Sequence, residues 1–437
     1  MLLGSFLFLL LGAAFEYISP LSMIDFKGLY YPARCLIQHG DPYSESEVLR
    51  TYQSDEANHL SDPERVRQVA TWYIYQPTAL TLTVPFAMLP WGPAHVLWMG
   101  FSFGSLIFAS FLIWNLGADY APLVSGALIG FLLANSEILA ITGNVAGIAI
   151  SLCGVGVWCF LRERFIPAGI LCFALSLAVK PHITGLVWLY FLLAGVVYRK
   201  RALQTLVVTA ALCLPAVLWV WHVSPHWMQE LRSTLSAFSV HGGLADPGPA
   251  STGARGLGML VNLQAVASFI RDDPRFYNPV SYLICGLLLL IWILAILKSR
   301  ASQKREWLAL AAIAALSLLP IYHRLYDAKL LLLTVPACAM LWAKGGLIGR
   351  LALLVNTAGL VLTGDIFWAF FAAILSNKHL PPTRLIGEVL MCVQVFSAPL
   401  ILLLVGIFYL WIYVRCSSAR SQERVAATVG ESGLRVS

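Results

Sequence analysis

Long uninterrupted apolar runs dominate this chain, and short polar stretches separate them. The run "LICGLLLLIWILAIL" at residues 283–297 is typical and contains no charged side chain. Such runs predict membrane-spanning helices, because backbone amides in lipid must pair within their own segment. A membrane β-barrel would instead show short segments of alternating polarity. The pattern predicts an all-α, polytopic integral membrane protein with about twelve transmembrane helices, at residues 2–19, 94–116, 121–141, 144–161, 166–182, 184–198, 204–222, 279–297, 306–320, 330–343, 351–372 and 388–413.

Composition agrees with this pattern. The 437 residues are 59% hydrophobic and only 12% charged, whereas soluble domains are about 25% charged. The net charge of +7 contains no basic tract interleaved with aromatic residues, so it predicts membrane orientation and no nucleic-acid partner. The nine cysteines form no Cys-x-x-Cys pair, so we expect neither a disulfide framework nor a metal site. Residues 1–15 lack a basic leader, which favours a retained helix over a cleaved signal peptide.

Short basic loops give the expected orientation. Each is separated from the next by two spans, so all of them predict a single cytoplasmic side; they are Arg162 with Arg164, 199–201, 298–305, Lys344 with Arg350, and the tail from Arg415. Residues 1–414 then form one transmembrane domain in the cell membrane, and 415–437 a disordered cytoplasmic tail. The large external (periplasmic) segments are 20–93, which includes a candidate re-entrant segment, and 223–278.

Residues 72–90 require a choice. If 2–19 crosses outward and 94–116 begins outside, then 72–90 cannot be a simple crossing. The segment begins at "YQP" and ends at "LPWGP", which favours a short, proline-bounded re-entrant or interfacial element. The alternative is that 72–90 does cross and that a later short run does not.

Unusual polar residues gather near the span ends on the expected external face. The orientation was counted from the basic loops alone, so this convergence is independent of it. Ionisable groups at membrane depth are costly and are candidates for function. The residues are Asp25, Tyr75, Gln76, Asn144, Lys180, His182, His323, Arg324, Asp327 and Lys329.

These residue types fit the transfer of a group from a lipid phosphate. Asp25 lies beside aromatic residues at the boundary of a span, where partial burial can tune a general base. Lys180, His182, His323, Arg324 and Lys329 supply cations and hydrogen-bond donors for a departing phosphate. No Gly-rich loop for a soluble nucleotide is present, so a lipid-linked donor is favoured.

Structural explanations stand beside each of these roles. Asp25 could pair with Lys27, Lys180 could reach the interface without a function, and Arg324 could pair with Asp327 in a solvated loop. His182 and His379 lack convincing metal-ligand spacing. Asp41 in "HGDPY" is typical of a turn, and the intramembrane Glu137 has no assigned place.

Several motifs occur in the order found in a known family. They are the loop "DFKGLYYPARCLIQHGDPYS", the segment "YQPTALTLTVPFAMLPW", the turn "GNV", the helix end "AGILCFALSLAVKPH" and the late motif "IYHRLYDAKLLLLTVPA". Over roughly residues 20–345, in motif order and spacing, the chain resembles glycosyltransferase family 87 of the GT-C superfamily. It is similar to the polyprenyl-phosphate-mannose-dependent α-mannosyltransferases.

The resemblance implies transfer of a hexose from a polyprenyl-phosphate sugar to a lipid or glycan acceptor on the external face, without cofactor or metal. It implies that Asp25 is the base and that Lys180 and His323 are site residues. The chain departs from the family pattern at Gln76, which replaces the first proline of the usual pair, and in "HRLYDAK", where a Trp-and-His pattern is common. Two alternatives remain: a transporter of a lipid-linked or anionic substrate, and a diphosphate-dependent glycan polymerase or ligase.

Overall fold

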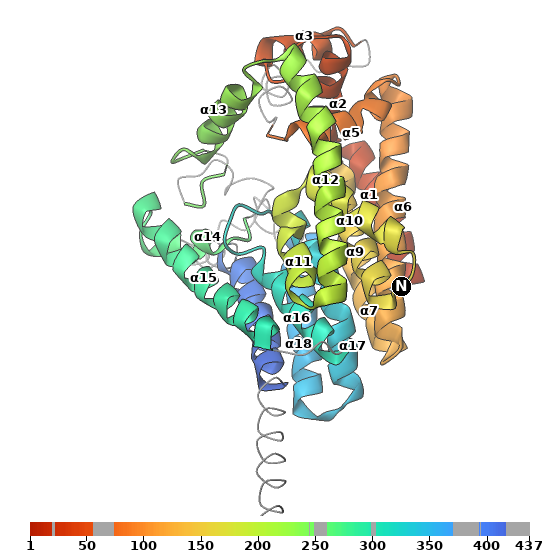
Figure 1. Cartoon of the computed structure of the whole chain (residues 1–437), viewed down its shortest axis with the longest axis vertical. Helices are drawn as coiled ribbons and strands as arrows, with labels where there is room; N and C mark the ends of the chain where they lie inside the picture. The colour runs from red at the N-terminus through yellow and green to blue at the C-terminus, as the bar shows by residue number, and fades with distance from the viewer. Residues whose placement is uncertain are drawn as a thin grey trace, which may run out of the picture.

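The protein is helical throughout the part of the chain that the structure describes. This computed structural model describes residues 1–19, 22–55, 74–243, 245–248, 260–298, 303–369, 393 and 395–416. Those ranges contain no strand beyond one isolated bridge between Leu260 and Arg324. The helices of the first half (Figure 1) are α1 Leu2–Ile18, α2 Ile24–Ile37, α3 Glu45–Gln53, α5 Pro77–Ala87, α6 Trp91–Ala118, α7 Pro122–Leu133, α8 Glu137–Thr142, α9 Ala146–Arg162 and α10 Ile166–Val179.

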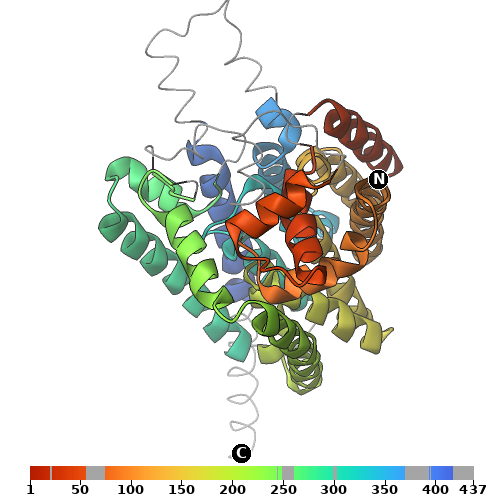
Figure 2. The ribbon, with the colours of Figure 1, turned by 90° about the horizontal axis from the view of Figure 1, so that it is seen from above.

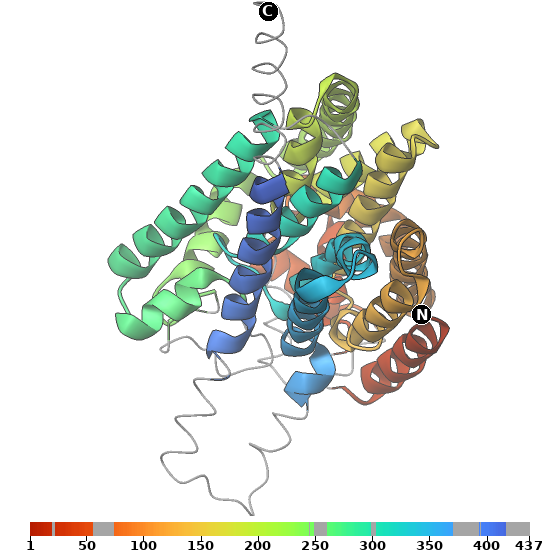
Figure 3. The ribbon, with the colours of Figure 1, turned by 90° about the horizontal axis from the view of Figure 1, so that it is seen from below.

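The second half contains the longest exposed helices and the only named 3₁₀ helix of the described residues. Its elements are α11 Pro181–Leu193, α12 Val196–Val223, α13 Trp227–Ser239, α14 Leu263–Ile270, α15 Pro274–Lys298, α16 Gln303–Leu316, the 3₁₀ helix η1 Leu325–Thr334, α17 Val335–Ala343 and α18 Gly346–Leu362. A C-terminal helix follows at Val395–Cys416. Seen from below, this helix crosses the bundle between α15 and the α16–α17 region (Figure 3).

Five helices in the described ranges are long and apolar enough to cross a membrane: α6, α12, α15, η1 continued by α17, and the C-terminal helix. Six more apolar helices have 10–17 residues. The expected all-helical membrane architecture is thereby confirmed, whereas the number of about twelve spans stays a prediction. Residues 370–392, which include parts of two expected spans, lie outside the described residues.

Several helix bounds differ from the expected spans for local reasons. The expected span 184–198 ends early, because α11 stops at Leu193 and the backbone turns at Gly195, whose φ is 146°. Only glycine adopts such a φ without strain. Within 72–90, helix α5 has 11 residues, or about 16 Å, which is too short to cross a bilayer alone. The orientation of this segment in a membrane stays a prediction.

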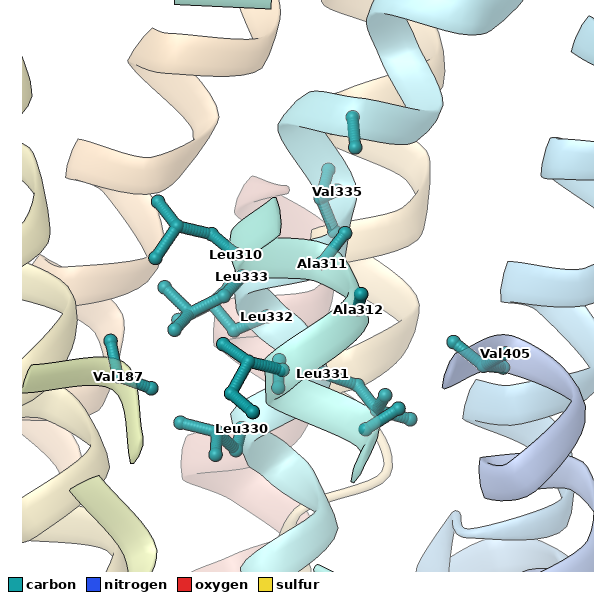
Figure 4. Packing of buried hydrophobic residues seen from close by; sticks show 14 of the residues in the cluster. Val187, Leu310, Ala311, Ala312, Leu330, Leu331, Leu332, Leu333, Val335 and Val405 are labelled. Carbon is teal, nitrogen blue, oxygen red and sulfur yellow. The ribbon is translucent and has the colours of Figure 1, made fainter. Parts of the chain in front are cut away.

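The core is formed where η1 packs against α16. The leucines at 330–333 lie beside Leu310, Ala311 and Ala312 of α16, with Val187 and Val405 on either side (Figure 4). Glycine permits close approach of the C-terminal helix, since a Cβ at Gly406 would lie 2.5 Å from a Leu316 methyl carbon. This packing holds the segment before η1 in the middle of the bundle.

The two ends of the bundle carry different sets of polar residues. At one end, polar contacts join the ends of α6, α9, α12, α16 and the C-terminal helix: Arg162 to Asp119 at 2.7 Å, Arg201 to Glu163 at 3.2 Å, Tyr198 to Glu306 at 3.2 Å, and Arg305 to the Cys416 carbonyl at 3.0 Å. Asn144, Lys180 and Tyr322 lie at the opposite ends of α9, α10 and α16. The view from above shows α2 and α3 over this second end (Figure 2).

Candidate active site

The turn between α8 and α9 places an amide against Asp25. Gly143 has a φ of 65°, and a Cβ there would lie 2.6 Å from the Met23 sulfur. A glycine at this position therefore lets the turn approach the start of α2 closely. The Asn144 side-chain oxygen accepts from the Ala146 N–H at 2.8 Å, and its amide nitrogen donates to Asp25 Oδ2 at 2.8 Å.

A proline-induced break places Lys180 at the same end. Pro181 disfavours helical geometry at the residue before it, and Lys180 has φ −147° and ψ 72° between α10 and α11. Its ammonium donates to Asp327 Oδ1 at 2.8 Å and lies 5.0 Å from the Tyr326 ring centroid. Thr78 of α5 donates to the Ala178 carbonyl at 2.6 Å, which holds the start of α5 beside this break.

Asp327 accepts from three groups on two segments. Besides Lys180, its Oδ2 lies 3.1 Å from His323 Nδ1 and accepts from the Arg324 N–H at 3.1 Å. Asp327 is buried, and His323 is fully buried behind it. Because a buried carboxylate needs such partners to stay charged, this arrangement fixes the 323–327 segment against Lys180.

Arg324 is the cation of the site whose charge is least compensated. Its Nε donates to the Tyr322 hydroxyl, and in the described chain no salt bridge joins it to a carboxylate. Burial lowers the pKa of Arg324, but the hydrogen bond to Tyr322 and the negative charge of Asp25 oppose this, so the guanidinium stays charged. Burial raises the pKa of Tyr322 and of Tyr75, which keeps both phenols protonated at neutral pH.

These residues surround one cavity of about 140 Å³. At the roughly 30 Å³ that one water takes in the liquid, this volume would hold about five waters. Acidic, basic and aromatic side chains converge on it from α2, the 74–76 segment before α5, the α10–α11 break, α13 and the 322–327 segment. The lining residues are Asp25, Ile74, Tyr75, Gln76, Val179, Lys180, Pro181, His182, Phe238, Tyr322, Arg324, Tyr326 and Asp327.

Most of the residues singled out from the sequence lie at this cavity. Asp25, Tyr75, Gln76, Lys180, His182, Arg324 and Asp327 all line it. Two others contact lining residues without lining the cavity themselves: Asn144 contacts Asp25, and His323 contacts Asp327. Asp41 does not belong to it; its Oδ1 accepts from the Tyr43 N–H at 2.9 Å, so the expected turn chemistry is confirmed.

Lys329 is not brought to the cavity. Its ammonium donates to Asp365 Oδ1 at 3.0 Å, to the Thr363 carbonyl at 3.3 Å and to the Asn135 carbonyl. Successive residues of a 3₁₀ helix differ by about 120°, so Lys329 leaves η1 on another side from Asp327. Glu137 lies near this pair, buried, with no hydrogen-bond partner among the described residues.

Three aromatic residues of the cavity were not anticipated from the sequence. Tyr322 and Tyr326 flank Arg324 in the motif that had been singled out, so their proximity to the charged residues was a usable signal. Phe238 comes from α13, in a segment expected only to be a large loop. No local pattern distinguishes it from the other apolar residues of that helix.

In the described ranges, one further cluster has metal-ligand side chains, namely His241, Asp246 and Asp272. None of the three lines the cavity. Asp246 already accepts from the Gly242 and Gly248 N–H groups, at 2.6 and 3.0 Å, and from the Tyr277 hydroxyl at 3.1 Å. These protein partners account for its burial without a cation.

Comparison with known proteins places the chain in a family. The family model described as glycosyltransferase family 87 matches residues 73–321, more than half of the chain. The matched range includes Tyr75, Gln76, Asn144, Lys180 and His182, and it stops just before the 322–327 segment. No curated protein and no solved structure matches. Together with the apolar helices, the match shows that the chain belongs to glycosyltransferase family 87 and is a membrane glycosyltransferase.

Proposed function

We propose that this chain transfers a hexose from a polyprenyl-phosphate sugar to a lipid or glycan acceptor. The specific hexose that we propose is mannose. One observation carries the proposal: a single cavity is lined by the carboxylate Asp25 and by the cations Lys180 and Arg324. Transfer from a phosphate needs a base for the incoming hydroxyl and positive charge for the outgoing phosphate. Glycosyltransferase family 87 membership supports the reaction class.

In this proposal Asp25 takes the proton of the acceptor hydroxyl. The acceptor oxygen bonds to the anomeric carbon, and the bond from that carbon to the phosphate oxygen breaks on the opposite face. The polyprenyl phosphate leaves with the bonding electron pair. Asn144 donates to one Asp25 oxygen, Oδ2, and thereby orients the carboxylate while the other oxygen stays free of that contact.

The leaving phosphate is held mainly by Arg324, with Lys180 as a second donor. Arg324 suits a phosphate because its planar fork can donate two parallel hydrogen bonds. Lys180 is already engaged by Asp327, so it contributes less net charge. His323 does not line the cavity; its ring lies 5.1 Å from the His182 ring, and its Nδ1 faces Asp327. Its proposed role is to position that carboxylate.

The two ends of the bundle support the proposed membrane orientation. Basic residues of α9, α12 and α16 gather at one end, and the cavity lies at the other. Lys and Arg are enriched in cytoplasmic loops. We therefore place the cavity on the external face of the cell membrane.

The test uses purified protein in nanodiscs with polyprenyl-phosphate mannose and a crude lipid acceptor. We expect polyprenyl phosphate to be released and the hexose to appear in the acceptor. The Asp25→Asn variant should lose roughly 10²- to 10⁴-fold in turnover, the usual contribution of a general base. Asp41→Asn is the matched control, because Asp41 follows α2 in the same segment between α1 and α5 but acts in a turn.

Two outcomes would contradict the proposal at different points. If Asp25→Asn turns over like Asp41→Asn, Asp25 is not the base. If a polyprenyl-diphosphate oligosaccharide reacts and the monophosphate sugar does not, the donor class is wrong and a polymerase or ligase is favoured.

A further inference from the structure

The cavity has one apolar ring whose position the charged residues do not explain. Phe238 lies in the last turn of α13, and α13 packs weakly, since Leu231 is its only buried residue. Leu235 and Met228 on the same helix are 42% and 47% exposed. The helix alone therefore does not hold Phe238 against the cavity, and the residues that follow must do so.

Those residues form a clasp around one buried carboxylate. Asp246 is 1% exposed, and its Oδ2 accepts from the Gly242 N–H at 2.6 Å and faces His241 Nδ1 at 3.1 Å. Its Oδ1 accepts from the Gly248 N–H and the Tyr277 hydroxyl. We call this group, centred on Asp246, the Asp246 clasp. The Ala245 N–H donates to the Phe238 carbonyl at 2.9 Å, which joins the clasp to the ring's own residue.

The clasp is continuous with the segment that carries Arg324. Ser268 of α14 donates to the Pro247 carbonyl at 3.1 Å. The residues before and within α14 are tied in turn to the cavity segment: the Val261 N–H donates to the His323 carbonyl at 3.0 Å, and the Gln264 side chain to the Pro320 carbonyl at 2.6 Å. Phe238 and Arg324 thus lie on segments joined by one connected network of backbone and side-chain hydrogen bonds.

We infer that Phe238, held by the Asp246 clasp, closes the cavity against bulk water and so directs the sugar to the acceptor instead of to water. The inference rests on the proposed function. An activated anomeric carbon reacts with any oxygen nucleophile that reaches it. Water would form the new bond to that carbon, give its proton to Asp25 and release free hexose with polyprenyl phosphate. Exclusion of water from a closed site prevents this side reaction.

The experiment measures how the sugar is partitioned in nanodiscs supplied with polyprenyl-phosphate mannose and the lipid acceptor. Phe238→Ala removes the ring, and Asp246→Asn keeps the size of the clasp residue but places an NH₂ group where the Gly242 N–H needs an acceptor. Both should raise the ratio of free hexose to transferred hexose several-fold. Leu235→Ala, at an exposed position of the same helix, should leave the ratio unchanged. Phe238→Leu, which keeps a large apolar side chain, should give a ratio close to that of the wild type.

An unchanged ratio in Phe238→Ala overturns the inference, even if total turnover falls, because a packing role alone would not change the partition. An equal rise in Leu235→Ala also overturns it. If the wild-type protein releases no polyprenyl phosphate, the proposed function has failed instead.

A second measurement does not depend on turnover. It tests the inference if the wild-type protein is inactive in this assay or if Phe238→Ala does not fold. A cysteine is introduced at position 238 or at position 235, and each variant is labelled with a soluble maleimide. The labelling of the native cysteines, measured in the wild type, is subtracted. Residue 238 should react more slowly than 235, and adding Asp246→Asn should accelerate labelling at 238 only. Equal rates at both positions would show that Phe238 does not close the cavity.

Discussion

Two lysine–aspartate pairs each have one member on η1, at positions two residues apart. Their surroundings differ. Lys180 meets Asp327 at 2.8 Å and Lys329 meets Asp365 at 3.0 Å. The first pair lines the cavity, and the second does not. Each joins segments distant in sequence, so distance and burial alone would not separate a site from a structural pair.

The partners of each lysine make the difference. Lys329 has three acceptors, two of them backbone carbonyls, so its ammonium is fully engaged. In the described chain, Lys180 donates to the single acceptor Asp327 and faces the ring of Tyr326, and the cavity lies beside it. A buried cation whose protein partners satisfy it holds helices together, whereas one with remaining donor capacity beside a cavity can bind a ligand.

The largest expected effect is on the structural pair. Lys329→Met leaves the largely buried Asp365 without its counter-charge, with the Ile138 N–H as its remaining donor. Breaking such a pair costs about 3–5 kcal/mol. We expect a large loss of stability, followed by thermal unfolding in detergent with tryptophan fluorescence. Lys344→Met, at an exposed lysine, is the control and should unfold like the wild type. A stable, active Lys329→Met protein would remove the distinction between the two pairs.

The next effect concerns the pair at the cavity. Lys180→Met should lower turnover by roughly 10²-fold, because a donor to the leaving phosphate is lost. Its stability should fall by only about 1–3 kcal/mol, since Asp327 keeps His323 and the Arg324 N–H. Turnover and unfolding are measured together, with the exposed Lys200→Met as control. If Lys180→Met unfolds as readily as Lys329→Met, both pairs are structural.

The smallest effect refines the assignment of Arg324. Tyr322→Phe removes the hydroxyl that accepts from Arg324 Nε and frees the guanidinium to move. Loss of one such hydrogen bond, about 1 kcal/mol, should raise the KM for the donor about threefold to tenfold. The kcat should change little, and Tyr282→Phe, at an exposed tyrosine of α15, should match the wild type. A fall in kcat alone would mean that Tyr322 acts in the chemical step.

Much of the fold follows from polarity along the chain, because lipid forces apolar runs to be helical. The common basic end is also supported: Arg162, Arg201 and Arg305 do lie at one end of the bundle. Bounds such as the early end of α11 depend on a single glycine conformation. The split of 325–343 into a 3₁₀ and an α-helix depends on packing against α16, which periodicity cannot reveal.

The site is predictable where a polar residue stands at the end of an apolar run. That rule finds Asp25, Lys180 and Arg324, and it fails for Lys329, whose direction depends on the 3₁₀ geometry of η1. It also misses Phe238, because an apolar residue in an amphipathic helix carries no signal of its own. Its place depends on the distant carboxylate of Asp246 and on Tyr277.

A genetic screen could mistake Gly143 for a residue that takes part in the reaction. Its φ of 65° and the Met23 sulfur, 2.6 Å from where a Cβ would stand, leave no room for another residue. A displaced turn would carry Asn144 away from Asp25. In a saturation scan scored by activity, Gly143 would rank among the most intolerant sites although it has no reactive group. Intolerance in such a map therefore marks the framework that aims the carboxylate as much as the carboxylate itself.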